Sequence, residues 1–212
     1  MKTQVRREFS PRKTPVQTRS GVTVEAIQEA TIQVLLKHGR ERLTTTRVAE
    51  RAGVSVGTLY QYYPNKRALL FSVMEQHLSR LADAVERACR EQRHQPLEAM
   101  VHGVVQAFVD AKMERTDISL ALYSIASELD GEVLVRRIGK RARSALTAML
   151  ETAPGMYFEN VEFTAMMMFA AMANATRAVL ESGPTPRMVR MLRRELVLMC
   201  NGYLAGSGAA KR

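Results

Sequence analysis

The chain has 212 residues, 46% of them hydrophobic, and its 31 Lys and Arg against 21 Asp and Glu give a formal net charge of +10. Roughly 70% of the unfolded chain's surface can be buried at this length, which excludes global disorder and makes a disulfide or metal unnecessary for a core. The two cysteines, Cys89 and Cys200, are far apart, and the four histidines lack the paired spacing of a zinc site. We therefore expect neither a disulfide-framed secreted fold nor a bound metal or cofactor.

The N-terminal third carries most of the excess positive charge. Residues 1–70 hold 13 basic and 5 acidic residues, whereas residues 71–212 hold 18 and 16. This distribution is typical of a protein that meets a polyanion, although basic tails also serve solubility alone. Residues 1–20 have no apolar core of signal-peptide type, and the charge-free stretch 163–176 is too short to span a bilayer. We expect a soluble, cytoplasmic protein with no membrane partner.

Apolar residues recur at helical spacing nearly throughout the chain, which predicts an all-α fold. Residues 1–20 contain two prolines and almost no large apolar side chain, so we expect a mobile basic arm. A first helix should start near Val22 and end at Gly39. A second, capped by Thr44 or Thr45, should run to about Arg51. The third and fourth helices are predicted at 56–62 and 66–93, capped by Ser55 and Asn65.

Five further helices are predicted in the rest of the chain. Pro96 opens one that ends near residue 115, Thr116 or Asp117 caps the next, and Asp130-Gly131 precedes a third that ends near residue 152. The last two, residues 157–182 and 186–203, are joined by a short connection of the kind that links antiparallel neighbours.

The most informative stretch is residues 43–70, where two short helices joined by Ala52-Gly53-Val54 predict a helix-turn-helix. Val48, Ala49, Val54 and Leu59 would fix the crossing angle and leave the second helix free to enter the major groove of B-DNA. The residues that point out of this second helix are Val56, Gly57, Thr58, Tyr60, Gln61 and Tyr62.

These residue types suit contacts to DNA. Ser55 and Thr58 can bond phosphate oxygens, and Gln61 is a plausible base reader. Gly57 permits close approach, and Lys66 adds a charge to a helix N-terminus that already favours an anion. The alternative interpretation is a short helical hairpin whose polar surface residues have no role in DNA binding.

Over residues 24–70 the sequence resembles the N-terminal domain of the tetracycline-repressor (TetR) family of bacterial transcriptional regulators. The resemblance is carried by Thr44-Thr45, Val48-Ala49, Ala52-Gly53-Val54-Ser55, Gly57-Thr58-Leu59-Tyr60, Tyr62-Tyr63 and Lys66. It implies core positions for Tyr63, where the family more often has Phe, and Leu69. It implies operator contacts, mostly to the DNA backbone, at Thr46, Arg47, Thr58, Tyr60, Gln61, Tyr62 and Lys66. Adding the residues of the motif itself, the predicted DNA-binding set is Thr45, Thr46, Arg47, Ser55, Val56, Gly57, Thr58, Tyr60, Gln61, Tyr62 and Lys66.

The resemblance also implies a helical domain for effector binding and dimerisation in the rest of the chain. We predict an arm at 1–20, a helix-turn-helix domain at 21–66, the effector and dimer domain at 67–205 and a tail at 206–212. The small residues of the helix at 157–182 would let it and the helix at 186–203 form a four-helix homodimer interface, with a monomer as the alternative. Such a dimer would bind a pseudo-palindromic operator.

Eleven of the 13 methionines lie after residue 99, and such adaptable side chains suit a hydrophobic effector, although methionine is also ordinary core filler. The predicted ligand-binding residues are Phe108, Tyr123, Met149, Met166 and Phe169. The basic residues from Arg136 to Arg143 form either a solvated face or a site for an anionic effector or DNA. No phosphate loop or nucleophile elbow is present, so no enzymatic activity is expected. We therefore expect a sequence-specific DNA-binding regulator, and the resemblance implies response to a ligand. Our interpretation is a repressor that a small hydrophobic ligand releases from its operator. The alternatives are a DNA-binding activator, a non-responsive binder or a helical protein-interaction module, because the sequence does not fix the sign of regulation.

Overall fold

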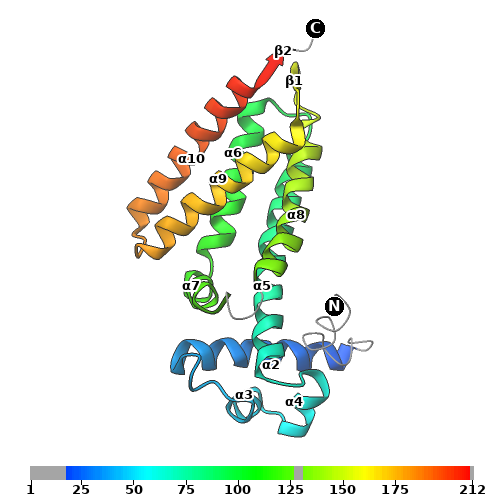
Figure 1. The fold of residues 1–212 in the computed structure, drawn as a ribbon, viewed down its shortest axis with the longest axis vertical. Helices are drawn as coiled ribbons and strands as arrows, with labels where there is room; N and C mark the ends of the chain where they lie inside the picture. The colour runs from blue at the N-terminus through cyan, green and yellow to red at the C-terminus, as the bar shows by residue number, and fades with distance from the viewer. Residues whose placement is uncertain (1–17, 127–130, 211–212) are drawn as a thin grey trace. The chain divides into compact units, whose positions relative to one another are not determined.

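The computed structural model describes residues 18–126 and 131–210 of the chain (Figure 1). Within these ranges the chain is almost entirely helical, which confirms the predicted all-α class. Two three-residue strands are the exception. The elements are α2 (Thr18–His38), α3 (Thr45–Ala52), α4 (Val56–Tyr62), α5 (Lys66–Glu91), α6 (Leu97–Met113), α7 (Thr116–Ile125), α8 (Gly131–Leu150), β1 (Met156–Phe158), α9 (Val161–Glu181), α10 (Pro186–Ser207) and β2 (Gly208–Ala210).

The chain forms two compact units. The first contains the described residues up to His77 together with Asp117–Leu134, and the second contains Leu78–Thr116 and the residues from Val135 onward. Helix α5 therefore supplies residues to both units. The sequence-based domain boundary at residue 66 remains a prediction, because compactness of the backbone does not test which residues serve DNA and which serve an effector.

The core of the first unit is built on α2, which packs against α3. Ile27, Val34 and Leu35 repeat at helical spacing and are all buried, and the buried hydroxyl of Thr31 donates to the carbonyl oxygen of Ile27 at 2.7 Å. Because that donation stays within the helix, the buried hydroxyl is satisfied without a partner from another element. This apolar face positions α3, which in turn contacts α4.

The second unit has its own core, in which α6, α9 and α10 pack against one another (Figure 1). Phe108 of α6 is fully buried, and its ring meets the edge of Phe169 of α9 with centroids 6.0 Å apart. Cys89 and Cys200 are buried in the same core, and this burial raises the thiol pKa of Cys89 to about 12 and that of Cys200 to about 11.

The strands β1 and β2 form an antiparallel pair in which Met156 lies opposite Ala210 and Phe158 opposite Gly208. The sequence predicted that a helix starts at residue 157, and this start is wrong. The range predicted as a tail, 206–212, includes the end of α10 and β2. Helix α9 starts only at Val161, because the Asn160 side chain caps it by accepting a hydrogen bond from the backbone N–H of Phe163 at 2.9 Å. Helix α10 continues to Ser207 and leads directly into β2. The pairing partner of β2 is β1, some fifty residues earlier in the chain.

Two other expectations can be compared with the residues that the structure describes. Helix α2 begins at Thr18 rather than near Val22, so Gly21 lies inside the helix, at a cost of about 1 kcal/mol relative to Ala. The predicted mobile arm therefore loses its last three residues to α2, and residues 1–17 lie outside the described ranges. By length and composition alone, α9 as a whole is long and apolar enough to cross a membrane, a criterion that the core helix of a soluble protein also meets.

Candidate nucleic-acid interface

The turn between α3 and α4 is set by local hydrogen bonds. The Thr44 hydroxyl caps α3 by accepting from the backbone N–H of Arg47 at 3.3 Å. At the other end, Gly53 adopts the left-handed conformation at φ 68°, and the Val54 N–H donates to the Ala49 carbonyl at 3.0 Å. This arrangement satisfies carbonyls at the helix end and turns the chain sharply into α4.

Helix α4 begins with a second cap. The Ser55 hydroxyl oxygen accepts from the backbone N–H of Thr58 at 2.9 Å and lies 2.8 Å from the Thr58 hydroxyl. After α4, the Asn65 side chain caps α5 by accepting from the N–H of Ala68 at 2.8 Å. The predicted caps at Ser55 and Asn65 are confirmed, and Thr44, one of two candidates, caps α3.

Apolar side chains fasten α4 to the rest of the first unit. Val48, Ala49 and Leu59 are buried as predicted, whereas Val54 is half-buried. Tyr63 is also buried, and this burial raises the pKa of its phenol, which has side-chain hydrogen bonds with Ser72 and Gln28. These contacts fix one face of α4, so that its other face is the one available to a partner.

The available face of α4 is polar. Gly57, Tyr60 and Gln61 are exposed, with Tyr60 at 42%, whereas Val56, Thr58 and Tyr62 are half-buried. The hydroxyl groups of Tyr60 and Thr45 lie 3.1 Å apart, which links the two helices. On α3, Thr46 and Arg47 are exposed and Thr45 is half-buried. The predicted DNA-binding residues thus lie on neighbouring parts of one surface in the first unit.

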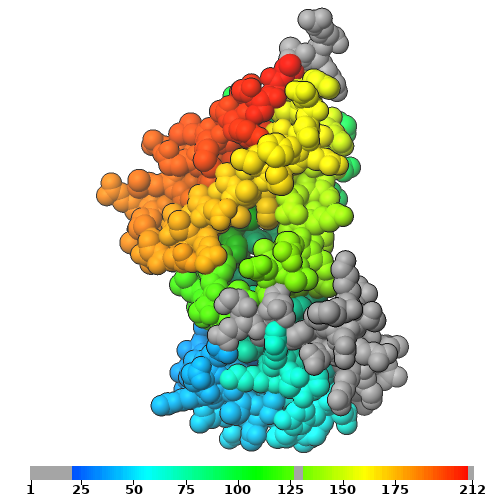
Figure 2. All heavy atoms as spheres, viewed as in Figure 1, coloured from blue at the N-terminus to red at the C-terminus, as the bar shows by residue number. Residues whose placement is uncertain are grey.

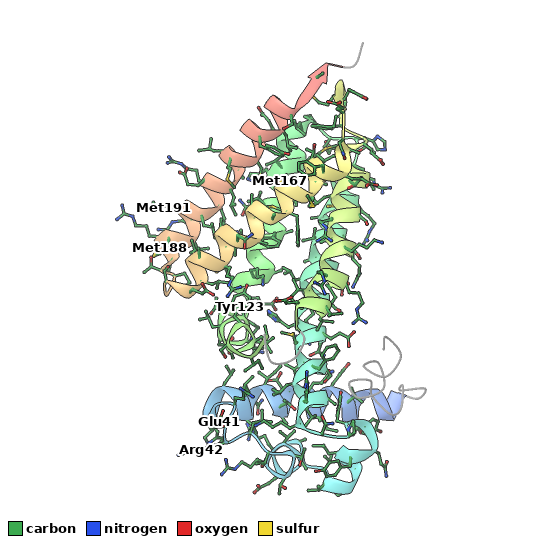
Figure 3. All side chains as sticks on the ribbon, viewed as in Figure 1. Glu41, Arg42, Tyr123, Met167, Met188 and Met191 are labelled. Carbon is green, nitrogen blue, oxygen red and sulfur yellow. The ribbon has the colours of Figure 1, made fainter. Side chains whose placement is uncertain are left out.

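Two basic side chains of this surface are held by the loop between α2 and α3. The ammonium group of Lys66 donates to the Arg40 carbonyl oxygen at 2.5 Å, and the guanidinium of Arg47 donates to the Arg42 carbonyl oxygen at 2.7 Å. Figure 3 labels Arg42 and Glu41 in this loop. This role of the loop was not predictable from the sequence, because every residue type supplies a backbone carbonyl acceptor.

The five predicted ligand-binding residues are divided between the two units. Phe108, Met149 and Phe169 belong to the core of the second unit, and Met166 of α9 is 40% exposed. Tyr123, labelled in Figure 3, belongs to α7 in the first unit. Neither of the two surface grooves described in the structure is lined by any of them. Among the described residues, no group of three His, Cys, Asp or Glu side chains could hold a metal ion.

Comparisons with known proteins agree with this geometry. Residues 27–73 match the family described as "Bacterial regulatory proteins, tetR family", and residues 96–204 match "Tetracyclin repressor-like, C-terminal domain". The HTH-type transcriptional repressor KstR of Mycolicibacterium smegmatis is 42% identical over 62 residues, which cover 29% of this chain and 30% of KstR. The alignments to the first curated relatives span 60% or less of each relative's length.

Solved structures share the fold over most of the chain. A TetR transcription regulator from Haloarcula marismortui superposes with a TM-score of 0.69 at 21% identity, covering 89% of this chain and 100% of that one. The fatty acid degradation regulator FadR from Bacillus halodurans gives 0.66 at 18% identity, covering 87% and 96%. The second family model alone matches just over half of the chain, and the first matches the helix-turn-helix. This chain therefore belongs to the TetR family of bacterial regulatory proteins.

Proposed function

We propose that the protein is a sequence-specific DNA-binding transcriptional regulator, with no enzymatic activity. The observation that carries this proposal is the polar face of α4, where Gly57, Tyr60 and Gln61 are exposed while Leu59 anchors the opposite face. One α-helix fits the major groove of B-DNA, and amide side chains there can read base edges. Family membership supports the same function.

Each residue of the surface has a proposed role. Gln61 reads a base edge, and the hydroxyl groups of Ser55 and Thr58 contact phosphate oxygens. Gly57 allows the helix to approach the DNA closely. The remaining proposed contacts, which serve mainly the phosphate backbone, are Thr45, Thr46, Arg47, Val56, Tyr60, Tyr62 and Lys66.

We further propose a homodimer that forms through α9 and α10. These helices lie side by side and make one continuous face (Figure 2), and Figure 3 labels Met167 and Met191 on them. Large apolar side chains on the two helices are left 40% to 57% exposed, which favours burial against a second copy. They are Phe163, Met166, Met167, Met191, Leu198 and Met199. The dimer would present two copies of α4 to pseudo-palindromic half-sites about 34 Å apart.

The regulator is proposed to be a cytoplasmic repressor that a small hydrophobic effector releases from its operator. The repressor name of KstR supports the sign of regulation. An effector that prefers a state with wrongly spaced recognition helices lowers DNA affinity by its differential affinity, about 1 to 3 kcal/mol. Helix α5 would transmit the change, because it supplies residues to both compact units. Phe108, Tyr123, Met149, Met166 and Phe169 remain the candidate contacts.

The test is selection of tight binders from a random DNA library, followed by fluorescence anisotropy across a salt series with a scrambled duplex as control. We expect an operator bound at about 10⁻⁸ M or better, well above the control. Gln61→Ala should weaken operator binding about tenfold and relax specificity at one position. Gln95→Ala is the matched control, since Gln95 is exposed in the turn before α6.

Equal, salt-sensitive binding to every duplex would reduce the interaction to charge attraction and contradict the proposal. Unchanged operator binding in both Gln61→Ala and Thr58→Ala would remove α4 as the recognition surface. Deletion of the gene would separate repressor from activator, since loss of a repressor raises expression of its target genes.

A further inference from the structure

We propose that a groove between α5 and α8 in the second unit binds a small organic polyphosphate. The groove has a volume of about 530 Å³, within the range of roughly 300 to 1,000 Å³ typical of small-molecule sites. The two helices lie side by side (Figure 1), and the lining side chains come from one face of each helix and from Arg93, just after α5. Five of them are basic, and Glu86 is the one acidic member.

An ion pair between Arg141 and Glu86, here called the clamp, crosses the groove and occupies the Glu86 carboxylate. The Arg141 guanidinium donates to both carboxylate oxygens of Glu86, at 2.9 and 2.8 Å, and also to Asp83 at 2.6 Å. Arg90 lies four residues after Glu86 on α5, the spacing at which Glu and Arg usually pair on one helix. Because Glu86 reaches across to α8 instead, Arg90 loses its nearest partner.

Three of the other cations are not neutralised by the groove itself. Within the described ranges, the exposed side chains of Arg90, Arg93 and Lys140 form no hydrogen bond or ion pair. Concentrating like charges around one concavity is unfavourable unless an anion is present. The C-terminal dipole of α5 favours cations near Arg90, but it amounts to only about half a charge.

The floor of the groove is apolar. It contains Cys89, Ala145 and Ala148, and Cys89 is buried. Burial holds the Cys89 thiol neutral, with its pKa raised to about 12, so no thiolate competes for the cations. Arginine forks match phosphate oxygens in geometry, and Arg90 and Arg93 both line the groove with exposed side chains. Cations spread over both helices fit a ligand with several phosphoryl groups and a less polar part that covers the floor.

The experiment is calorimetric titration of the full-length protein, without DNA, at low salt with pyrophosphate, ATP and adenosine. This site does not depend on the proposed function, because ligand binding is measured on the protein alone. We expect saturable binding of pyrophosphate and ATP but not of adenosine. Lys140→Gln and Arg90→Gln should each weaken binding about threefold to tenfold, as loss of one charge-assisted contact implies.

Arg136→Gln on α8 and Arg87→Gln on α5 are the matched controls, because both side chains are exposed and neither lines the groove. They remove the same charge and should leave the affinity within about twofold, since they make no direct contact. All four positions are exposed, and thermal unfolding would verify the fold of each variant. No saturable binding of pyrophosphate or ATP, or equal losses in groove and control variants, would overturn the proposal. The proposal would also be overturned if Lys140→Gln weakened binding to random duplex DNA but left the binding of pyrophosphate and ATP unchanged.

Discussion

The hydroxyl groups of Thr45 and Tyr60 lie 3.1 Å apart and connect the two helices of the helix-turn-helix at the surface of the first unit. Tyr60 is 42% exposed, so the same phenol that braces α4 against α3 also lies on the face proposed to meet DNA. The contact between the two helices and the proposed DNA contact therefore use the same side chain, and a substitution can separate the two roles.

Tyr60→Phe removes the hydroxyl group and keeps the ring. We expect the free energy of unfolding to fall by about 0.5 to 1 kcal/mol, the net contribution of one exposed hydrogen bond. Urea unfolding followed by circular dichroism measures the change. Tyr157→Phe is the control, because Tyr157 is exposed in β1 and its hydroxyl makes no hydrogen bond with a described residue. Equal stabilities of wild type and Tyr60→Phe would show that the contact contributes nothing.

Gly53→Ala should destabilise the protein by about 1 to 2 kcal/mol, because an L side chain is disfavoured in the left-handed conformation at φ 68°. No atom lies within 4 Å of the added Cβ, so the cost is one of backbone conformation alone. Gly21→Ala is the matched control in the same unit. Its Cβ also meets nothing, but Gly21 is helical, so Ala should stabilise by up to about 1 kcal/mol. Thermal unfolding should shift in opposite directions, and shifts of the same sign would contradict this account.

Leu198→Glu should convert the proposed dimer into a monomer, because it places a charge on the apolar face of α10 where Leu198 is 57% exposed. Light scattering coupled to size-exclusion chromatography gives the mass directly. Leu36→Glu makes the same chemical change at an exposed position of α2 and should leave the mass unchanged. A Leu198→Glu variant with the mass of the wild type would exclude this face as the interface.

The clamp between Arg141 and Glu86 should contribute a coupling energy of no more than about 1 kcal/mol, because the Arg141 side chain is 41% exposed. The hydrogen bonds to Glu86 and Asp83 raise the pKa of Arg141, so its guanidinium stays charged at every working pH. A double-mutant cycle with Arg141→Gln and Glu86→Gln measures the coupling, which should shrink at molar salt. The exposed helical pair Arg177 and Glu181 provides the comparison, with about 0.3 to 0.5 kcal/mol expected. A coupling that ignores salt would contradict an electrostatic origin.

The sequence was most informative where structure depends on neighbouring residues. The Ser55 and Asn65 caps and the left-handed Gly53 are short-range hydrogen-bonding and steric effects, so residue type alone predicts them. The helical period also identified Val48 and Leu59 as core. These local effects are sufficient to build the candidate recognition surface.

Features that join distant segments were not predictable in this way. The strand β2 forms by pairing with β1, where Gly208 lies opposite Phe158. A three-residue strand is too short to show an alternating hydrophobic pattern in the sequence. The Glu86–Arg141 clamp depends on how α8 packs against α5, whereas on sequence alone Arg90 is the nearer partner of Glu86. Which side chain of a methionine run is buried also depends on packing between helices: of Met166, Met167 and Met168, only Met168 is buried.

The two buried thiols have a practical consequence. With pKa values raised to about 12 and 11, Cys89 and Cys200 stay protonated at neutral pH, and maleimides and related labels react with the thiolate. A cysteine introduced at the exposed Glu41 position would therefore be labelled in preference to both native cysteines. In the proposed dimer, a spin label at that position on each subunit would measure the distance between the two DNA-binding units directly. The chain would keep both of its natural cysteines.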